Sequence, residues 1–339
     1  MLIVLKEKND APLIAHIQEL LTKKYECASH VIGENRRVIA IPGDTSRIDV
    51  GIFRNLAGVA SVDRVDRPYK LASREWKNRT IIEVNTKCTI GKENTVVVMA
   101  GPCSIESESQ LDETAAMAKE AGATVLRGGA FKPRTGPYSF QGLGEKALVM
   151  LKRAGEKYGM ATISEAMNGE QVELLRDYAD IIQIGARNMQ NYELLRCAGK
   201  SKKPIMLKRG IAATLEEFLL AAEYILHGGN ENVILCERGI RTFEQEVRFT
   251  LCLGSIPALR ELTHLPIIVD PSHAAGTARW VAPLSLAAVA VGADGLIIEI
   301  HPRPEEAKSD GPQALDRAAW TACMHGIASV TTAIGKTLV

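Results

Sequence analysis

The feature that most constrains this 339-residue chain is a strand-then-helix period that repeats eight times from residue 95 onward. Short apolar runs typical of buried strands alternate with amphipathic patterns typical of helices. Eight such units in one run predict a (β/α)8 TIM barrel of the α/β class. An open doubly wound sheet is the alternative, although no GxGxxG motif follows the first strand. The eight strand-like runs are residues 95–104, 124–129, 160–166, 181–186, 204–210, 233–239, 266–273 and 295–302.

A smaller unit precedes the barrel. Residues 1–70 read as strand, helix, strand, strand, helix, strand, which is the βαββαβ order of a ferredoxin-like domain. Residues 71–95 are expected to form a linker and a β-hairpin, and residues 96–339 the barrel. The order of elements alone assigns no function to the first domain.

Two expected helices begin with recognisable capping residues. Asp10 is placed as the N-cap of the first helix, with Pro12 in its first turn. Thr242 and Gln245 have the spacing of a capping box, which predicts a helix directly after the strand-like run 233–239.

Composition excludes several classes of protein. The formal net charge of +1 gives no general attraction to nucleic acid or anionic membranes. The seven cysteines contain no CxxC pair, so neither a zinc knuckle nor a disulfide framework is indicated. The first ten residues lack the pattern of a signal peptide. The longest apolar run, residues 280–300, is interrupted by polar residues and reads as a helix followed by a strand. We therefore expect a cytoplasmic protein.

Ionisable side chains stand at the end of nearly every expected strand. In a barrel these ends meet on one face, which is where the active sites of this fold lie. The pattern therefore predicts an active site there. In chain order the residues are Cys103, Arg127 with Lys132, Glu165, Arg187, Lys208 with Arg209, Glu237 with Arg238, Asp270 with His273, and Glu299 with His301.

The cations of this set indicate an anionic ligand. Positive charges that converge on one cavity repel each other unless anions occupy it. The segment 126–144 contains five glycines and three cations but no acidic residue, which suits backbone and side-chain binding of an anion. The candidate anion-binding residues are Arg127, Lys132, Arg134, Arg187, Lys208 and Arg238.

A second group has the donor atoms of a metal site. Cys103, His273, Glu299 and Asp310 follow strands that are neighbours in a closed barrel. A thiolate, an imidazole and two carboxylates suit a divalent Mn, Fe, Co or Zn ion, and Asp270 could orient His273. An inert core cysteine, or a Cys103–His273 nucleophile and base pair, is the alternative reading.

The motifs at these strand ends resemble those of 3-deoxy-D-arabino-heptulosonate 7-phosphate (DAHP) synthases of the type Iβ branch. The likeness covers the barrel, and "PYKLASRE" at residues 68–75 resembles members with a ferredoxin-like extension. The matching segments are "AGPCSIES", "LRGGAFKPRTGPYSFQGLG", "IQIGARNMQN", "LKRG", "ILCERGIRTFE", "DPSHAAG" and "EIHPRPEEAKSDGPQAL".

The resemblance implies a transferase that condenses phosphoenolpyruvate with erythrose 4-phosphate at the entry to aromatic amino-acid biosynthesis. Arg134 and Thr135 are then expected to bind the aldose phosphate. Lys132 is the candidate proton donor, with a pKa lowered by neighbouring cations, and Glu165 is expected to orient the attacking water. The expected metal ligands are Cys103, His273, Glu299 and Asp310. Phosphoenolpyruvate is expected to contact Arg127, Lys132, Ala186, Arg187, Lys208 and Arg238.

Two other functions compete with this interpretation. The sister enzyme that makes 3-deoxy-D-manno-octulosonate 8-phosphate from arabinose 5-phosphate typically reads K-A-N-R-S where this chain has "KPRT". The other is a non-catalytic sensor of aromatic amino acids. The family likeness also implies feedback inhibition by tyrosine or phenylalanine through the first domain, with His30 in the effector region, and assembly into tetramers.

Overall fold

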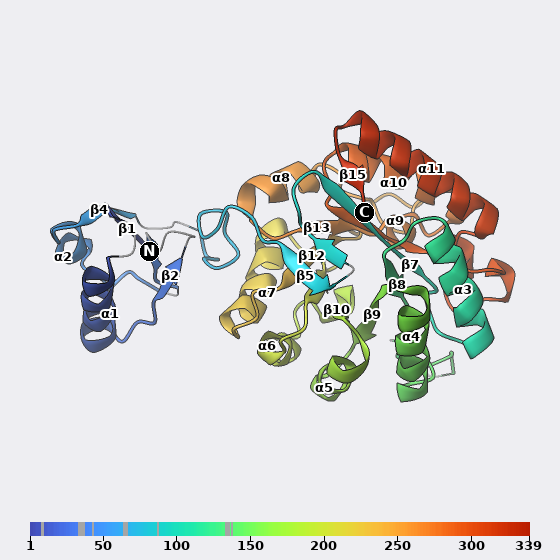
Figure 1. The fold of residues 1–339 in the computed structure, drawn as a ribbon, viewed down its shortest axis with the longest axis horizontal. Coiled ribbons are helices and arrows are strands. Elements are labelled where there is room, and N and C mark those ends of the chain that lie inside the picture. Colours follow the sequence, from blue (N-terminus) through green and yellow to red (C-terminus); the bar gives the residue numbers. More distant parts are fainter. Residues whose placement is uncertain are drawn as a thin grey trace. The chain divides into compact units, whose positions relative to one another are not determined.

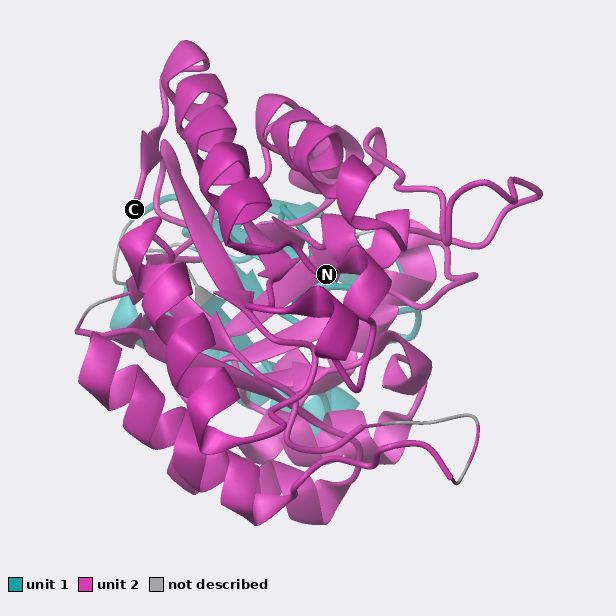
Figure 2. Ribbon diagram, turned by 90° about the vertical axis from the view of Figure 1, so that its right-hand side faces the viewer, with its two compact units in different colours: residues 1–78 teal, residues 79–339 magenta. Residues whose placement is uncertain are grey.

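The computed structural model describes residues 1–7, 10–32, 38–42, 44–63, 67–86, 88–132, 136 and 138–339, without the side chain of Ile32. The chain forms two compact units, residues 1–78 and 79–339 (Figure 2). Residues 71–78 of the predicted linker thus belong to the first unit, and residues 79–95 to the second. Within the described ranges, no helix is long and apolar enough to cross a membrane.

The first unit has the predicted ferredoxin-like topology. Its antiparallel sheet has the strand order β2-β3-β1-β4. Asp10 caps α1 as expected, because its side chain accepts a hydrogen bond from the backbone N–H of Leu13 at 3.2 Å. The elements in chain order are β1 (Leu2–Leu5), α1 (Ala11–Tyr25), β2 (His30–Ile32), β3 (Val38–Ala40), α2 (Val50–Arg54) and β4 (Val59–Asp63).

The second unit contains the predicted barrel of eight parallel strands (Figure 1). Each strand pairs with the next along the chain, and β14 pairs with β7, which closes the barrel. The strands are β7 (Thr95–Gly101), β8 (Val125–Arg127), β9 (Ala161–Ala166), β10 (Ile181–Ile184), β11 (Ile205–Lys208), β12 (Val233–Glu237), β13 (Ile267–Val269) and β14 (Gly295–Glu299).

Helices alternate with these strands and surround them (Figure 1). The main α-helices are α3 (Glu108–Glu120), α4 (Glu145–Tyr158), α5 (Gly169–Tyr178), α6 (Tyr192–Lys200), α7 (Leu215–His227), α8 (Ser255–Leu262), α10 (Ala278–Ala290) and α11 (Arg317–Ala333). The short pieces are η1 (Ala186–Asn188), α9 (Pro271–Ala275), η2 (Pro304–Glu306), η3 (Gly311–Gln313) and β15 (Thr337–Leu338), which pairs with β7.

A hairpin of β5 (Ile82–Asn85) and β6 (Cys88–Ile90) precedes the barrel, at the residues where the sequence predicts one. Ile82, Cys88 and Ile90 are buried in one apolar cluster with residues from the beginnings of the barrel strands, such as Val97 and Val125. The hairpin therefore contributes apolar side chains to the end of the barrel interior opposite the strand ends that carry charge.

The predicted helix at Thr242 is wrong. The chain runs as a loop from Arg238 to Gly254, and α8 begins only at Ser255. Ile240 and Thr250 form a bridge with two backbone hydrogen bonds, and the hydroxyl of Thr242 lies 2.6 Å from that of Thr250. The hydroxyl of Thr242 also accepts a hydrogen bond from the backbone N–H of Glu244 at 3.2 Å, so it closes a local turn and a contact across the loop, and no helix follows it.

Candidate active site

A cavity of about 320 Å³ lies at the carboxyl ends of the barrel strands. Predicted ionisable side chains at the ends of β8, β9, β11 and β12 reach it. Two residues of the predicted set, Arg209 and Glu237, do not line it and pair with each other instead. Its lining residues are Arg127, Lys132, Glu165, Gln183, Gly185, Ala186, Arg187, Lys208, Ile211, Arg238, Arg241, Arg248, Phe249, His273, Ser309 and Asp310.

Two of the predicted anion-binding cations are paired with buried carboxylates. The guanidinium Nη1 of Arg127 donates to Oε1 of Glu299 at 2.8 Å, and Lys208 forms an ion pair with Asp270. Buried charges of this kind are retained where a partner or a ligand compensates them. These two side chains are therefore held in place before any ligand binds.

Arg238 has a different environment. It is 5 % exposed, and its Nη1 atom finds no hydrogen-bond partner in the part of the chain that the structure describes. Its guanidinium carbon lies 4.0 Å from the ring centroid of Phe249, and burial lowers its pKa from the usual value. A buried guanidinium with an unsatisfied donor at a cavity wall is suited to bind an anion.

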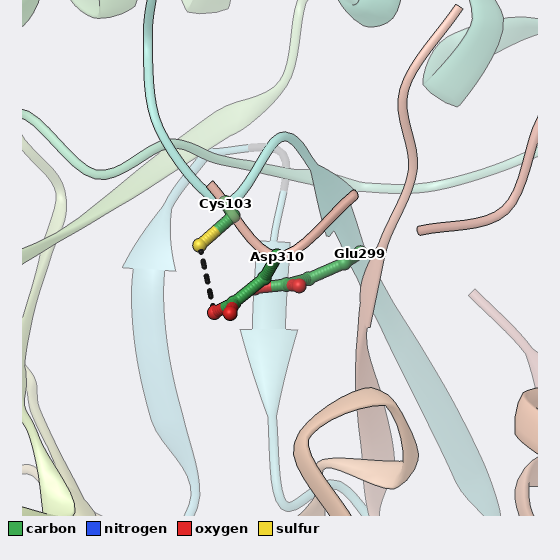
Figure 3. Close-up of side chains that lie close together, drawn as sticks. All are labelled: Cys103, Glu299 and Asp310. Carbon is green, nitrogen blue, oxygen red and sulfur yellow. Dashed lines mark hydrogen bonds between the residues drawn. The ribbon is translucent and has the colours of Figure 1, made fainter. Parts of the chain in front are cut away.

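The predicted metal-binding side chains lie together. The Sγ of Cys103 and carboxylate oxygens of Glu299 and Asp310 are all within 4.8 Å of one another (Figure 3). The thiol of Cys103 lies 3.3 Å from Oδ2 of Asp310. His273 completes the group, because its Nε2 lies 3.6 Å from Oε1 of Glu299 and 3.9 Å from Oδ2 of Asp310.

The chemistry of this donor set fits a divalent transition ion. Burial lowers the pKa of His273 despite the neighbouring Asp270, which favours the neutral imidazole that binds metals. As the sequence suggested, Asp270 lies beside this ring, with Oδ2 at 2.8 Å from Nδ1, so the opposite nitrogen is free to face the carboxylates. Burial, followed by the charge of Glu299, raises the pKa of Cys103 to about 12. A cation bound here would favour the thiolate instead.

Lys132 lies between the cluster and the cavity. Its Nζ donates to the backbone oxygen of Cys103 at 2.8 Å and to the sulfur at 3.0 Å. The prediction that the pKa of Lys132 is lowered is wrong. Burial lowers the pKa of Lys132, but the charges of Cys103, Glu165 and Glu299 together raise it above the usual value. Its immediate neighbours are acceptors and not the other cations.

Glu165 projects into the cavity from β9. Its Oε2 accepts a hydrogen bond from the side-chain amide of Gln183 on the next strand at 3.0 Å. Gly185 makes room for it, because a Cβ at residue 185 would lie 2.1 Å from Oε1 of Glu165. The carboxylate is therefore confined between β9 and the end of β10.

The remaining predicted site residues are distributed as follows. Arg187 and Ala186 belong to η1 and line the cavity. Arg134 and Thr135 lie outside the described residues. His30 belongs to the first unit, where its ring centroid lies 5.9 Å from that of Trp76 in an edge-on arrangement.

Sequence reasoning missed two arginines of the cavity, Arg241 and Arg248, and did not include Gln183. Arg241 stands in the "ILCERGIRTFE" segment, so a signal was present. Both arginines were overlooked because the sequence predicted a helix at the position of the loop that carries them.

Comparison with known proteins places this site in a family. Residues 79–334 match the model of the DAHP synthetase I family, and residues 1–67 match the DAHP synthase ferredoxin-like domain. The chain belongs to the DAHP synthetase I family. A phospho-2-dehydro-3-deoxyheptonate aldolase of Thermotoga maritima is 48% identical over 337 residues, with 99% of each chain covered.

Solved structures agree with this assignment to the DAHP synthetase I family. The crystal structure of the T. maritima phospho-2-dehydro-3-deoxyheptonate aldolase superposes with a TM-score of 0.79 at 47% identity, covering 100% of this chain and 99% of that one. A 2-dehydro-3-deoxyphosphooctonate aldolase of Syntrophotalea carbinolica is more distant, at 33% identity over 67% of this chain and 87% of its own length.

Proposed function

We propose that this protein condenses phosphoenolpyruvate, erythrose 4-phosphate and water to DAHP and inorganic phosphate. The observation that carries the proposal is the buried guanidinium of Arg238, whose Nη1 has no partner among the described residues, in a cation-lined cavity beside the Cys103–Glu299–Asp310 cluster. Two phosphorylated substrates need concentrated positive charge, and the carbonyl of the aldose needs an electrophile next to it.

Phosphoenolpyruvate would occupy the part of the cavity lined by Arg187, Lys208 and Arg238. Arg238 offers a free donor there, and Arg187 is exposed to the cavity, so both can form charge-assisted hydrogen bonds with phosphate or carboxylate oxygens. Arg127 and Lys132 would complete the binding site, with the backbone of Ala186. For the phosphate of erythrose 4-phosphate we retain Arg134 and Thr135 as the candidate residues.

Cys103, His273, Glu299 and Asp310 would hold the divalent metal. When bound, such an ion supplies Lewis-acid polarisation of the aldehyde oxygen. Lys132 would deliver a proton to the alkoxide oxygen formed when the new carbon–carbon bond closes; its contact with the sulfur of Cys103 at 3.0 Å and its place in the cavity lining support this role. Glu165 would orient the water that adds to the phosphate-bearing carbon before phosphate leaves.

The decisive experiment measures phosphate release from phosphoenolpyruvate with erythrose 4-phosphate, and separately with arabinose 5-phosphate. We expect turnover with the four-carbon sugar, its loss on chelation and its return with manganese. Turnover only with arabinose 5-phosphate would favour the activity of the sister enzyme, and activity indifferent to chelator would contradict the metal site. Absence of turnover with either sugar under any metal would leave the sensor function as the better interpretation.

Assembly and regulation belong to the same proposal. A cytoplasmic homotetramer inhibited by tyrosine or phenylalanine would follow the pattern that the family likeness implies. His30 and Trp76, which pack edge to face, offer aromatic surface for such an effector in the first unit. Unchanged activity at saturating tyrosine and phenylalanine would remove the regulatory part.

A further inference from the structure

The two carboxylates of the cluster are connected by a hydrogen-bonded bridge from outside it. The side-chain amide of Gln313, in η3, donates from Nε2 to Oε2 of Glu299 at 2.6 Å. Its oxygen accepts from Nη1 of Arg248 at 2.9 Å, and the same Nη1 lies 3.5 Å from Oδ1 of Asp310. Gln313 is 2 % exposed, so water has little access to its side-chain amide.

The bridge holds one oxygen of each carboxylate, and the other oxygen of each lies next to the cluster. Oε2 of Glu299 accepts a hydrogen bond from Gln313, whereas Oε1 accepts one from Arg127 at 2.8 Å and lies 3.6 Å from Nε2 of His273. Oδ1 of Asp310 faces Arg248, whereas Oδ2 lies 3.3 Å from the sulfur of Cys103. A monodentate ligand needs this kind of orientation, because free rotation of the carboxylate would cost entropy on binding.

Arg248 is itself anchored next to the histidine of the cluster. Its backbone N–H donates to the oxygen of Ala275 in α9 at 3.4 Å, and the following residue, Phe249, donates to Ala274 at 2.9 Å. Gly276 makes this approach possible, since a Cβ there would lie 2.6 Å from Cβ of Arg248. The loop after β12 is thus attached to the helix that carries His273.

We propose that Gln313, together with Arg248, is a positioning residue that holds Glu299 and Asp310 in the orientation required to bind the divalent ion. The inference rests on the proposed metal site and extends it to two residues that do not themselves bind the ion. Removal of the bridge weakens metal binding, while the cations that bind phosphoenolpyruvate stay in place.

The test compares the full-length protein with its Gln313→Met variant, which keeps the length of the side chain and removes both hydrogen bonds without changing charge. The dissociation constant for manganese is measured by titration into chelator-treated protein. We expect it to rise by about 10- to 100-fold, as for other residues that orient metal ligands. Phosphoenolpyruvate binding to the metal-free protein is expected to stay within about twofold. Cobalt-loaded protein should show an altered visible spectrum, because the ligand geometry changes.

Asn230→Leu serves as the matched control. Asn230 is a buried amide at the opposite end of the barrel, where it donates to backbone oxygens of Ala198 and Lys203. Its loss should lower stability and leave the manganese constant unchanged. If Gln313→Met does not fold, Gln313→Asn, which keeps the amide but is too short to reach both partners, takes its place.

The outcomes distinguish a failure of the proposed metal site from a failure of the positioning role of Gln313. Failure of the unmodified protein to bind manganese would overturn the proposed metal site, and this inference with it. Tight manganese binding that is the same in the unmodified protein and the Gln313 variant would overturn only the inference. Equal weakening in the Gln313 and Asn230 variants would also overturn it, because the effect would then be a general loss of structure.

Discussion

Neighbouring arginines at adjacent strand ends have opposite roles because their partners differ. Arg209, which follows β11, is buried with its Nη1 at 2.7 Å from Oε2 of Glu237. Glu237 also accepts from the hydroxyl of Ser255 at 2.9 Å and from the N–H of Gly239 at 2.7 Å. Arg238 is equally buried and lacks such a carboxylate among the residues described. The first arginine is therefore structural, and the second is available to a ligand.

Replacing each of these arginines by methionine should separate stability from binding. Arg209→Met leaves Glu237 buried without its counter-charge and should lower the free energy of unfolding by about 3–5 kcal/mol. Arg238→Met should weaken phosphoenolpyruvate binding by about 10- to 100-fold, since hydrogen bonds to charged groups contribute roughly 1.5–3 kcal/mol. Urea denaturation and phosphoenolpyruvate titration of both variants check this. Similar stability losses in the two variants would contradict the distinction.

At the scale of elements, the β5–β6 hairpin is part of the barrel core. Ile82 is fully buried in the cluster that fills the beginning of the barrel, whereas its neighbour Ile81 is 52 % exposed. Ile81 directly precedes β5 and Ile82 begins it, and the side chains of two consecutive extended residues point to opposite faces.

Ile82→Ala should therefore destabilise the barrel as a whole by about 2–5 kcal/mol, through lost burial and a residual cavity. Ile81→Ala, the matched control, should change the free energy of unfolding by less than about 0.5 kcal/mol. Chemical denaturation followed by circular dichroism measures both. If Ile82→Ala unfolded no earlier than Ile81→Ala, the hairpin would be an appendage and not a part of the core.

At the scale of the whole molecule, the positions of the cavity residues indicate which of the two units carries the candidate active site. Those that the structure describes fall between Arg127 and Asp310, within the second unit, and no described residue of 1–78 is among them. A structure has also been solved for a truncated form of the T. maritima DAHP synthase. It superposes on 80% of the present chain with a TM-score of 0.75.

A chain of residues 79–339 should accordingly fold and release phosphate from the two substrates at a rate within about tenfold of the full chain, since the second unit has its own core. Any inhibition of the full chain by tyrosine or phenylalanine should be lost. Steady-state assays of both forms with and without each amino acid test this. Inhibition that persists after truncation would place the effector site in the barrel.

The local sequence pattern was sufficient to predict the order of the helices and strands and the face of the barrel on which the candidate site lies. Strand-like runs of buried residues, and capping by Asp10, depend on neighbours in the chain, so they can be read directly. Parallel strands in a closed barrel end at one face, so residues that follow each strand, such as Cys103 and Glu299, are brought together whatever their separation in sequence. The loop at Thr242 was misjudged because its contact with Thr250 lies across the loop.

Residue order alone was therefore enough to predict the face of the barrel on which the ionisable side chains gather, whereas the pairing of these side chains, and which of them are left to line the cavity, depends on the folded chain. Glu237 pairs with Arg209, and Glu299 pairs with both Arg127 and Gln313. The partners lie far apart in the chain and are in hydrogen-bonding contact only in the folded protein. The same distances set the raised pKa of Lys132, whose sequence neighbours are cations but whose spatial neighbours are acceptors. The strength of an electrostatic interaction depends on the distance between the charges and on their burial. Neither the distance nor the burial of a side chain can be read from the residues next to it in the sequence.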